Sequence, residues 1–199
     1  MKTVKDDRVE AYIYQEAKPG NHESGDVYYT FTNEDYFLCA IADGLGNGPI
    51  ARESAEIVPE VLEKHHDESI DQLLSRCNMH MHQKRGAAVA IIKAYFKTST
   101  IEYSCVGNVR FYLYRRSDDK MIYPLPVMGY LSGRPQKLRT QGYDYGPGDL
   151  FLLHSDGVDI RSPKAFMQNS AGPYDLYKKV FDTLKHGDDA TYIAGSLLR

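Results

Sequence analysis

Four aspartates, Asp26, Asp43, Asp156 and Asp188, are the residues of this sequence best suited to chemistry, because each stands at the end of a strand-like segment. Asp43 follows the apolar run from Tyr36 to Ala42, which predicts a buried strand that ends at this carboxylate. The glycines at 44, 46 and 48 carry no side chains, so a backbone carbonyl there can approach a ligand closely. An acidic group beside open backbone suits a cation or a phosphate. A strand that ends in Asp-Gly is also an ordinary turn, so this pattern alone leaves both interpretations open.

A predicted hairpin brings a second carboxylate to Asp43. The turn-rich stretch from Pro19 to Asp26 leads into a strand-like segment, Val27 to Phe31, and Asn33-Glu34-Asp35 turns the chain back toward Asp43. In an antiparallel pair, the start of one strand lies beside the end of its neighbour. We therefore expect Asp26 and Asp43 to meet at one edge of a sheet.

The other two aspartates repeat this pattern. A buried strand from Leu150 to Ser155 ends at Asp156-Gly157, and Asp188-Asp189 precedes a last strand, Tyr192 to Ala194. Carboxylates that crowd in one cleft repel each other and take up protons unless cations neutralise them. Oxygen ligands without histidine or thiolate nearby select Mg²⁺ or Mn²⁺ over zinc. Taken singly, each aspartate is better explained as a turn or a cap, and only the four together in this order favour a metal site.

The remaining segments indicate an α+β fold that positions these residues. Apolar spacing predicts a helix around Ser54 to Leu62, which Pro59 should kink or divide, and a clearer helix from Ile70 to Met81. Short turns between consecutive strands predict an antiparallel meander. Its expected strands are Ala87 to Phe96, Thr100 to Val106, Val109 to Tyr114 and Met121 to Leu125. The stretch Pro124 to Arg139 is too rich in proline and glycine for regular structure and is interpreted as a cleft rim. A first strand, Arg8 to Gln15, and two late helices, Ser162 to Asn169 and Tyr174 to Leu184, complete the prediction.

Composition limits the function classes. The 199 residues fit a single domain, 1–199, and the net charge of −3 gives no electrostatic reason to expect nucleic acid. No apolar run reaches the length that crosses a membrane, and the start of the chain has no apolar signal region, so we expect a cytoplasmic protein without a membrane partner. The cysteines lie in apolar surroundings and are interpreted as core thiols, and the histidines at 65, 66, 80 and 82 are assigned to solvent.

The ordered acidic motifs resemble those of the metal-dependent PP2C (PPM) family of serine/threonine protein phosphatases, over about residues 20 to 196. The motifs are Ser24-Gly25-Asp26, Ala42-Asp43-Gly44-Leu45-Gly46, Ser155-Asp156-Gly157 and Asp188-Asp189-Ala190-Thr191. Two internal segments, Arg85 to Ala88 and Ser104 to Arg110, also look like strand motifs of the family. The compact bacterial RsbX-like branch is the most similar, through Cys39 to Gly46, Val106 to Phe111 and Tyr123 to Lys137.

The resemblance implies a four-layer α/β/β/α sandwich of two antiparallel sheets flanked by helices. It also implies two bound Mn²⁺ or Mg²⁺ ions, with Asp43 bridging both, Asp26 and the carbonyl of Gly44 serving one, and Asp156 and Asp188 the other. Asp43 and Asp156 would then be the catalytic pair. A water held between two divalent ions is deprotonated near neutral pH and can attack phosphorus in line. The expected reaction is hydrolysis of phosphoserine or phosphothreonine on stressosome regulators of the STAS-domain type, by a monomeric enzyme.

Two departures from the larger eukaryotic relatives leave roles unassigned. Leu45 stands where those relatives have a histidine, and no arginine lies between Val9 and Asp43 to hold the phosphate. His22 and His154 lie near the motifs and are interpreted as bystanders, while Arg52 and Arg134 are weak candidates for phosphate contacts. Two alternatives stay open: a catalytically silent module of the same fold that binds a phosphoprotein, and a hydrolase of small phosphate compounds with a deep base-stacking pocket.

Overall fold

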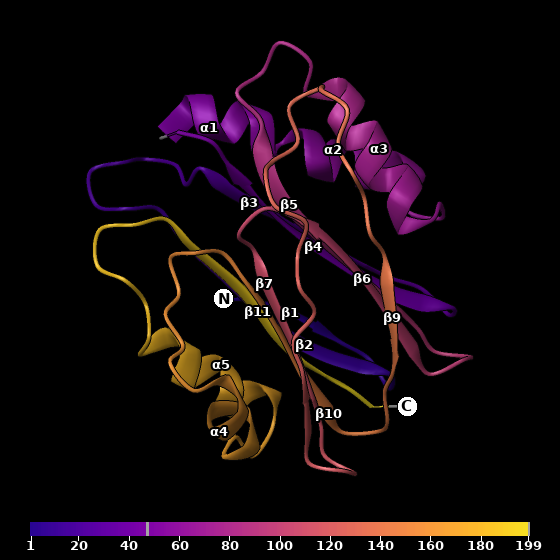
Figure 1. Cartoon of the computed structure of the whole chain (residues 1–199). Coiled ribbons are helices and arrows are strands. Elements are labelled where there is room, and N and C mark those ends of the chain that lie inside the picture. Colours follow the sequence, from indigo (N-terminus) through magenta and orange to yellow (C-terminus); the bar gives the residue numbers. More distant parts are fainter. Residues whose placement is uncertain (47, 199) are drawn as a thin grey trace.

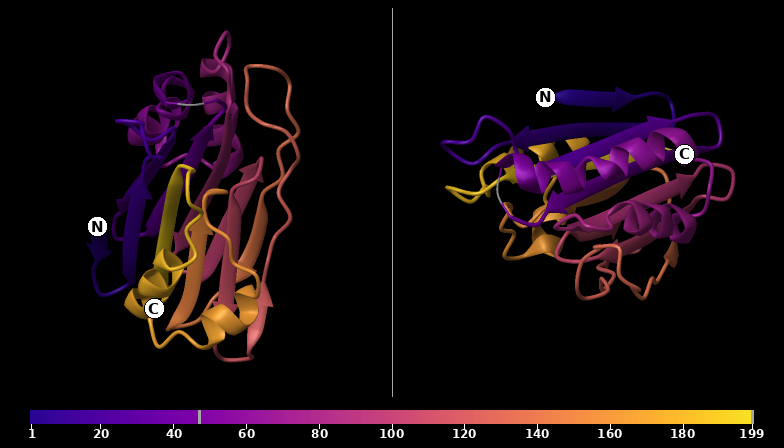
Figure 2. Two further views of the ribbon diagram at one scale, coloured as in Figure 1. Left: turned by 90° about the vertical axis from the view of Figure 1, so that its left-hand side faces the viewer. Right: turned by 90° about the horizontal axis from the view of Figure 1, so that it is seen from above.

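Two antiparallel sheets pack face to face and carry helices on their outer faces, which gives four layers (Figures 1 and 2). The computed structural model describes residues 1–46 and 48–198, so Asn47 in the predicted glycine-rich stretch lies outside the described residues, as does Arg199. The expected α+β fold with two antiparallel sheets is confirmed.

The first sheet has six strands and the second has five. In the first sheet the order is β1 (Lys2–Lys5), β2 (Val9–Glu16), β11 (Ala190–Leu197), β10 (Asp149–His154), β7 (Arg110–Arg115) and β8 (Lys120–Ile122). In the second sheet the order is β3 (Asp26–Thr32), β4 (Tyr36–Gly44), β5 (Ala87–Tyr95), β6 (Thr100–Val106) and β9 (Gln141–Asp144). The last strand in chain order, β11, therefore lies in the middle of the first sheet.

Each sheet has its own set of helices. The helices α1 (Gly48–Ala55), α2 (Ile57–His65) and α3 (Ile70–His80) cover the second sheet, and α4 (Pro163–Gln168) and α5 (Pro173–Phe181) cover the first (Figure 1). A capping box at Ser69 and Gln72 fixes the start of α3. The predicted division of the first helix by Pro59 is confirmed, and the break falls at Glu56, just before the turn that contains the proline. Pro59 sits in the first turn of α2, where the missing N–H would have no partner in the helix.

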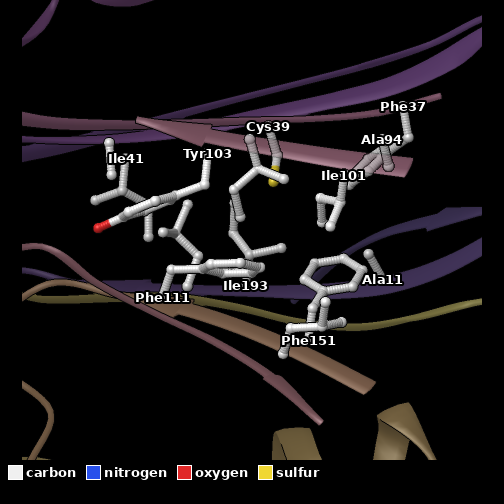
Figure 3. Packing of buried hydrophobic residues seen from close by; sticks show 14 of the residues in the cluster. Ala11, Phe37, Cys39, Ile41, Ala94, Ile101, Tyr103, Phe111, Phe151 and Ile193 are labelled. Atoms are coloured by element: carbon white, nitrogen blue, oxygen red, sulfur yellow. The ribbon is translucent and has the colours of Figure 1, made fainter. Parts of the chain in front are cut away.

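The sequence of β4 is an unbroken apolar run because both faces of this strand are buried. Phe37, Cys39 and Ile41 face the first sheet (Figure 3), while the alternate residues of β4 pack under the helices. Phe37 meets the ring of Phe151, with ring centroids 5.8 Å apart. A Cβ on Gly195 would lie 2.3 Å from the Phe151 ring, so only glycine fits opposite it. All three cysteines are buried and free, as predicted.

The predicted meander is wrong after β6. The chain turns at Gly107-Asn108 and enters the first sheet, so β6 and β7 belong to different sheets. Gly107 has a φ of +121°, and a Cβ there would lie 2.3 Å from the Cβ of Ala88, so this corner requires glycine. Two further differences concern β1, which the sequence did not predict, and β11, which extends on both sides of Tyr192 to Ala194.

Two of the four histidines, His65 and His66, depart from their assignment to solvent, because both are half-buried. His66 stacks on Phe31 with ring centroids 3.8 Å apart, and its Nδ1 lies 2.8 Å from the hydroxyl of Tyr36. It is therefore half-buried rather than solvated.

Candidate metal centre

The predicted hairpin places Asp26 directly opposite Asp43. The two residues are register partners at the start of β3 and the end of β4. Gly44 continues the same edge and pairs with Ala87 of β5. A Cβ on Gly44 would lie 1.9 Å from the carbonyl oxygen of Ala51, so glycine is required where α1 packs against the end of β4. The second sheet therefore contributes one pair of carboxylates and an adjoining backbone carbonyl.

The first sheet contributes the other pair. Asp156 lies just after β10 and Asp188 just before β11, and these two strands are antiparallel neighbours. The N–H of Ser155 donates to the carbonyl of Thr191 at 2.9 Å. A Cβ on Gly157 would lie 1.9 Å from the carbonyl oxygen of Asp189. Glycine is therefore needed for the two loops to meet, and their meeting brings Asp188 to Asp156.

Asp189 joins the two sheets at this end of the sandwich. Its carboxylate accepts hydrogen bonds from the backbone N–H of Gly25 at 3.0 Å and of Lys18 at 2.9 Å. Gln15 adds a second link by donating to the carbonyl of Asp26 at 2.8 Å. The loops before β3 and before β11 consequently lie side by side (Figure 1). All four predicted aspartates share this end of the molecule.

Neither Asp26 nor Asp43 forms an ion pair within the described residues. Asp26 is only 1% exposed, and its Oδ2 has no hydrogen-bond partner in the described part of the chain. Burial raises the pKa of Asp26 well above its usual range, against the opposing effect of the hydroxyls of Ser155 and Thr191. Burial and the charges of Asp26 and Asp156 raise the pKa of Asp43 to about 8.

Asp156 shows the same effect. Its pKa is also raised, first by burial and then by the charge of Asp188, which is itself exposed. Carboxylates held together in this way favour either protons or cations.

The donor set fits a hard divalent cation. It consists of carboxylate oxygens and the Gly44 carbonyl, and it includes one buried oxygen, Asp26 Oδ2, that accepts no hydrogen bond from the described residues. Among residues 1–46 and 48–198, no group of three or more histidine, cysteine, aspartate or glutamate side chains is already arranged to hold a metal ion. Aspartates that repel each other are expected to stand apart until a cation draws them together.

Two side chains that the sequence did not single out orient Asp156. Asn108 Nδ2 donates to Asp156 Oδ2 at 2.8 Å, and the ammonium of Lys185 donates to the Asp156 carbonyl. Asn108 reaches this position because the chain changes sheets at Gly107-Asn108. The Gly-Asn pair was therefore the one sequence signal for the position of Asn108, but it was interpreted as a turn between two strands of the same sheet.

The other sequence candidates lie in different settings. His154 is buried, it donates from Nδ1 to the Ser155 carbonyl at 2.7 Å, and burial lowers its pKa to about 4. His22 and Arg134 are exposed. Arg52 is held by Glu56 at 2.8 Å and donates to the carbonyl of Ser24 at 3.3 Å. None of these contacts involves a carboxylate of the cluster.

A cavity of about 790 Å³ lies between α4, α5 and the loops that follow β10 and α5, but its lining includes none of the four aspartates. A smaller cavity of about 340 Å³ includes Asp188 together with Phe181 and Lys185.

Comparison with known proteins defines the class. The family model described as Stage II sporulation protein E (SpoIIE) matches residues 33–196. The chain belongs to this family, and it is a metal-dependent phosphatase of the PP2C type. None of the helices in the described residues is long and apolar enough to cross a membrane.

The chain is similar to RsbX in both sequence and structure, over nearly its full length. The chain is 34% identical to "Phosphoserine phosphatase RsbX" of Bacillus subtilis (strain 168), over 99% of both chains. A crystal structure of RsbX in complex with magnesium superposes with a TM-score of 0.94 at 33% identity, covering 98% of each chain.

More distant structures share the fold. A solved structure described as belonging to work on the bacterial stressosome has a TM-score of 0.84 at 26% identity, over 95% of this chain and 99% of the other. The PP2C phosphatase domain of SpoIIE from Bacillus subtilis has a TM-score of 0.77 at 18% identity, over 96% of this chain and 63% of that one.

Proposed function

We propose that this chain hydrolyses phosphoserine or phosphothreonine on stressosome regulator proteins of the STAS-domain type, with two Mn²⁺ or Mg²⁺ ions at the aspartate cluster. The observation that carries the proposal is the meeting of two carboxylate pairs from different sheets, with Asp26 fully buried and one of its oxygens unsatisfied. A phosphatase that works by positioning and charge neutralisation needs this type of centre.

The ligand roles follow from the two sheets. Asp26, Asp43 and the carbonyl of Gly44 would hold one ion, and Asp43, Asp156 and Asp188 would hold the other. Bound divalent ions supply a deprotonated water near neutral pH and neutralise charge on the phosphoryl oxygens. Asp43 and Asp156 are the proposed catalytic residues in this scheme.

Neighbouring residues of the chain keep the ligands in place. Asn108 and Lys185 fix Asp156 through its carboxylate and its carbonyl. Asp189 ties the loop that carries Asp188 to the backbone of Gly25, next to Asp26. Polar groups of this kind, which orient ligands without binding the metal, commonly contribute as much as tenfold to hundredfold in metal affinity or activity.

Two observations support a protein substrate over a small phosphate compound. A relative of 26% identity is described in the context of the bacterial stressosome, a modular signalling system. The 790 Å³ cavity that could enclose a small molecule is not lined by the aspartates. A cluster at the end of a sandwich can instead meet a residue presented by a folded partner.

Phosphate release from a STAS-domain protein phosphorylated on serine tests the proposal, with MnCl₂, MgCl₂ or EDTA in parallel reactions. We expect turnover with metal, none with EDTA, and none for Asp156→Asn. The matched control is Asp35→Asn, an exposed aspartate at the opposite end of the β3–β4 hairpin, which should retain wild-type turnover. Mn²⁺ binding without any release would instead support the silent phosphoprotein-binding module, and wild-type turnover by Asp156→Asn would contradict the ligand assignment.

A further inference from the structure

The stretch from Tyr123 to Arg139, here called the rim segment, joins an edge strand of one sheet to an edge strand of the other. It leaves β8 in the first sheet and enters β9 in the second, and it contains no helix or extended strand. In Figure 1 it is the orange loop that rises beside α3, and in the left view of Figure 2 it stands along one side of the molecule. The proposed phosphatase chemistry does not use it.

Backbone hydrogen bonds hold the rim segment in one shape. Val127 donates to the carbonyl of Cys105 at 2.8 Å and accepts from Gly107 at 2.9 Å, while Leu131 and Ala87 exchange hydrogen bonds of 2.9 and 3.0 Å. Asn78 of α3 accepts from the N–H groups of Ser132 and Gly133, both at 3.0 Å. A surface that is ordered in advance loses little entropy when a partner binds it.

The rim segment presents apolar side chains to solvent. Nine large hydrophobic residues in the described chain are exposed, and four of them fall within eight consecutive positions: Tyr123, Leu125, Met128 and Tyr130. Leu125 is 65% exposed and Met128 is 84% exposed. Single exposed apolar residues are ordinary, but several gathered on an ordered loop mark a surface that binds a partner. Methionine adapts readily to such a surface.

Charge indicates the kind of partner. The rim segment holds three basic residues, Arg134, Lys137 and Arg139, and no acidic residue, although the whole chain carries a net charge of −3. All three are exposed, and none forms an ion pair within the described residues. Such a surface complements a partner with acidic side chains, and a phosphorylated partner brings a further charge of about −1.5 to −2.

The rim segment also lies close to the aspartate cluster. Gly44, Ala87 and Leu131 are neighbours across three adjacent backbone segments. Two strand spacings of about 4.8 Å place Leu131 about 10 Å from Gly44, the proposed carbonyl ligand. Gly129 lies against Gly107, which packs on Ala88, the register partner of Asp43. A folded protein that presents a phosphorylated residue to Asp43 is therefore within reach of the rim segment.

We propose that the rim segment is the docking surface for the folded phosphoprotein substrate, and that it recognises an acidic surface with apolar side chains around the phosphorylated residue. This inference rests on the proposed function. Tyr123, Leu125, Met128 and Tyr130 supply the apolar contact, while Lys137 and Arg139 supply charge complementarity. The aspartate cluster acts on the phosphoryl group, and the rim segment selects the protein that carries it.

Two paired variants test the surface: Leu125→Ser/Met128→Ser removes apolar contact, and Lys137→Glu/Arg139→Glu reverses charge. The control is Tyr174→Ser on α5, at an aromatic side chain that is 46% exposed on the helical face of the other sheet. Each protein is assayed with MnCl₂ on p-nitrophenyl phosphate, which needs only the aspartate cluster, and on the serine-phosphorylated STAS-domain protein. Binding of that phosphoprotein is also measured directly, by fluorescence anisotropy in EDTA.

Both rim variants should raise KM and Kd for the phosphoprotein at least fivefold, while kcat/KM for p-nitrophenyl phosphate stays within twofold of the wild type. At low salt, the charge variant should bind the phosphoprotein more weakly than the wild type. In 0.5 M NaCl the Kd of the wild type should rise toward that of the charge variant, because salt screens exposed charges. Tyr174→Ser should match the wild type throughout.

The outcomes separate the two proposals. Wild-type turnover of the phosphoprotein by both rim variants would overturn the docking surface and leave the phosphatase function standing. If the phosphoprotein binds in a way that depends on the rim segment but no phosphate is released, the docking surface stands and the proposed phosphatase function is overturned. If sedimentation shows a wild-type dimer that Leu125→Ser/Met128→Ser dissociates, the partner of this surface is a second copy of the chain and the docking proposal is wrong.

Discussion

Replacing Asp43 with asparagine should stabilise the metal-free protein and, at the same time, abolish its stabilisation by metal. Burial and the neighbouring aspartates raise the pKa of Asp43 to about 8. A carboxyl group with a raised folded-state pKa binds a proton that the unfolded chain has released, so its presence lowers stability as pH rises from about 4 to about 8. Each unit of this shift corresponds to about 1.4 kcal/mol. Asparagine removes the charge but keeps a buried polar group. We therefore expect the substitution to recover about half of the free energy that corresponds to this pKa shift.

The expected gain is about 3 kcal/mol in the free energy of unfolding at pH 8, which for a chain of this size corresponds to roughly 6–12 °C in Tm. The gain should fall to about 1 kcal/mol or less at pH 5, because Asp43 keeps its proton in the folded state there and pH 5 lies only about one unit above the pKa of the unfolded chain. Thermal unfolding followed by circular dichroism in EDTA measures both values, and Asp35→Asn serves as the matched control.

Metal provides the second half of this test. Mn²⁺ at a hundred times its Kd should stabilise the wild type by about 2.7 kcal/mol. It should leave Asp43→Asn unchanged, because the proposed bridging ligand is lost. A variant that unfolds at or below the wild-type temperature in EDTA, or that still gains stability from Mn²⁺, would refute the placement of Asp43 at the centre of a repulsive cluster.

Three further substitutions test the surroundings of the centre. Gly157→Ala places a Cβ 1.9 Å from the Asp189 carbonyl and should weaken Mn²⁺ binding at least tenfold by calorimetry, whereas Gly172→Ala, with nothing within 4 Å, should not. Asn108→Ala removes the 2.8 Å hydrogen bond to Asp156 and should lower kcat/KM for p-nitrophenyl phosphate by roughly tenfold, while an unchanged rate would deny Asn108 an orienting role. Lys93→Met leaves the carbonyls of His66 and Glu68 without the buried ammonium that bonds both at 2.9 Å. It should cost about 3 kcal/mol of stability in urea unfolding with no change in metal affinity, and a loss below about 1 kcal/mol would contradict this reasoning.

The sequence was sufficient wherever the information was local. Asp26 and Asp43 belong to one hairpin, and the period of its strands together with the turn between them determines that the two carboxylates meet. The family resemblance added the expectation that Asp156 and Asp188 join them. Their approach is visible in the structure through Gly157 and Asp189, yet their metal roles remain proposals.

Long-range organisation was less accessible. The turn at Gly107-Asn108 looks the same in sequence whether the next strand pairs with the previous one or enters the other sheet. The choice depends on the close contact between Gly107 and Ala88, which are 19 positions apart and become neighbours only after folding. Asn108 was therefore interpreted as a turn residue, although it contacts Asp156.

The central position of β11 has a consequence for when this protein can become active. β11 is the last strand in chain order, yet it pairs with both β2 and β10, and Asp188 and Asp189 immediately precede it. A ribosome that has made every earlier element has therefore produced a sheet with its middle strand missing and only three of the four aspartates. The proposed metal centre can therefore assemble only after Asp188 has been synthesised and β11 has entered the sheet between β2 and β10.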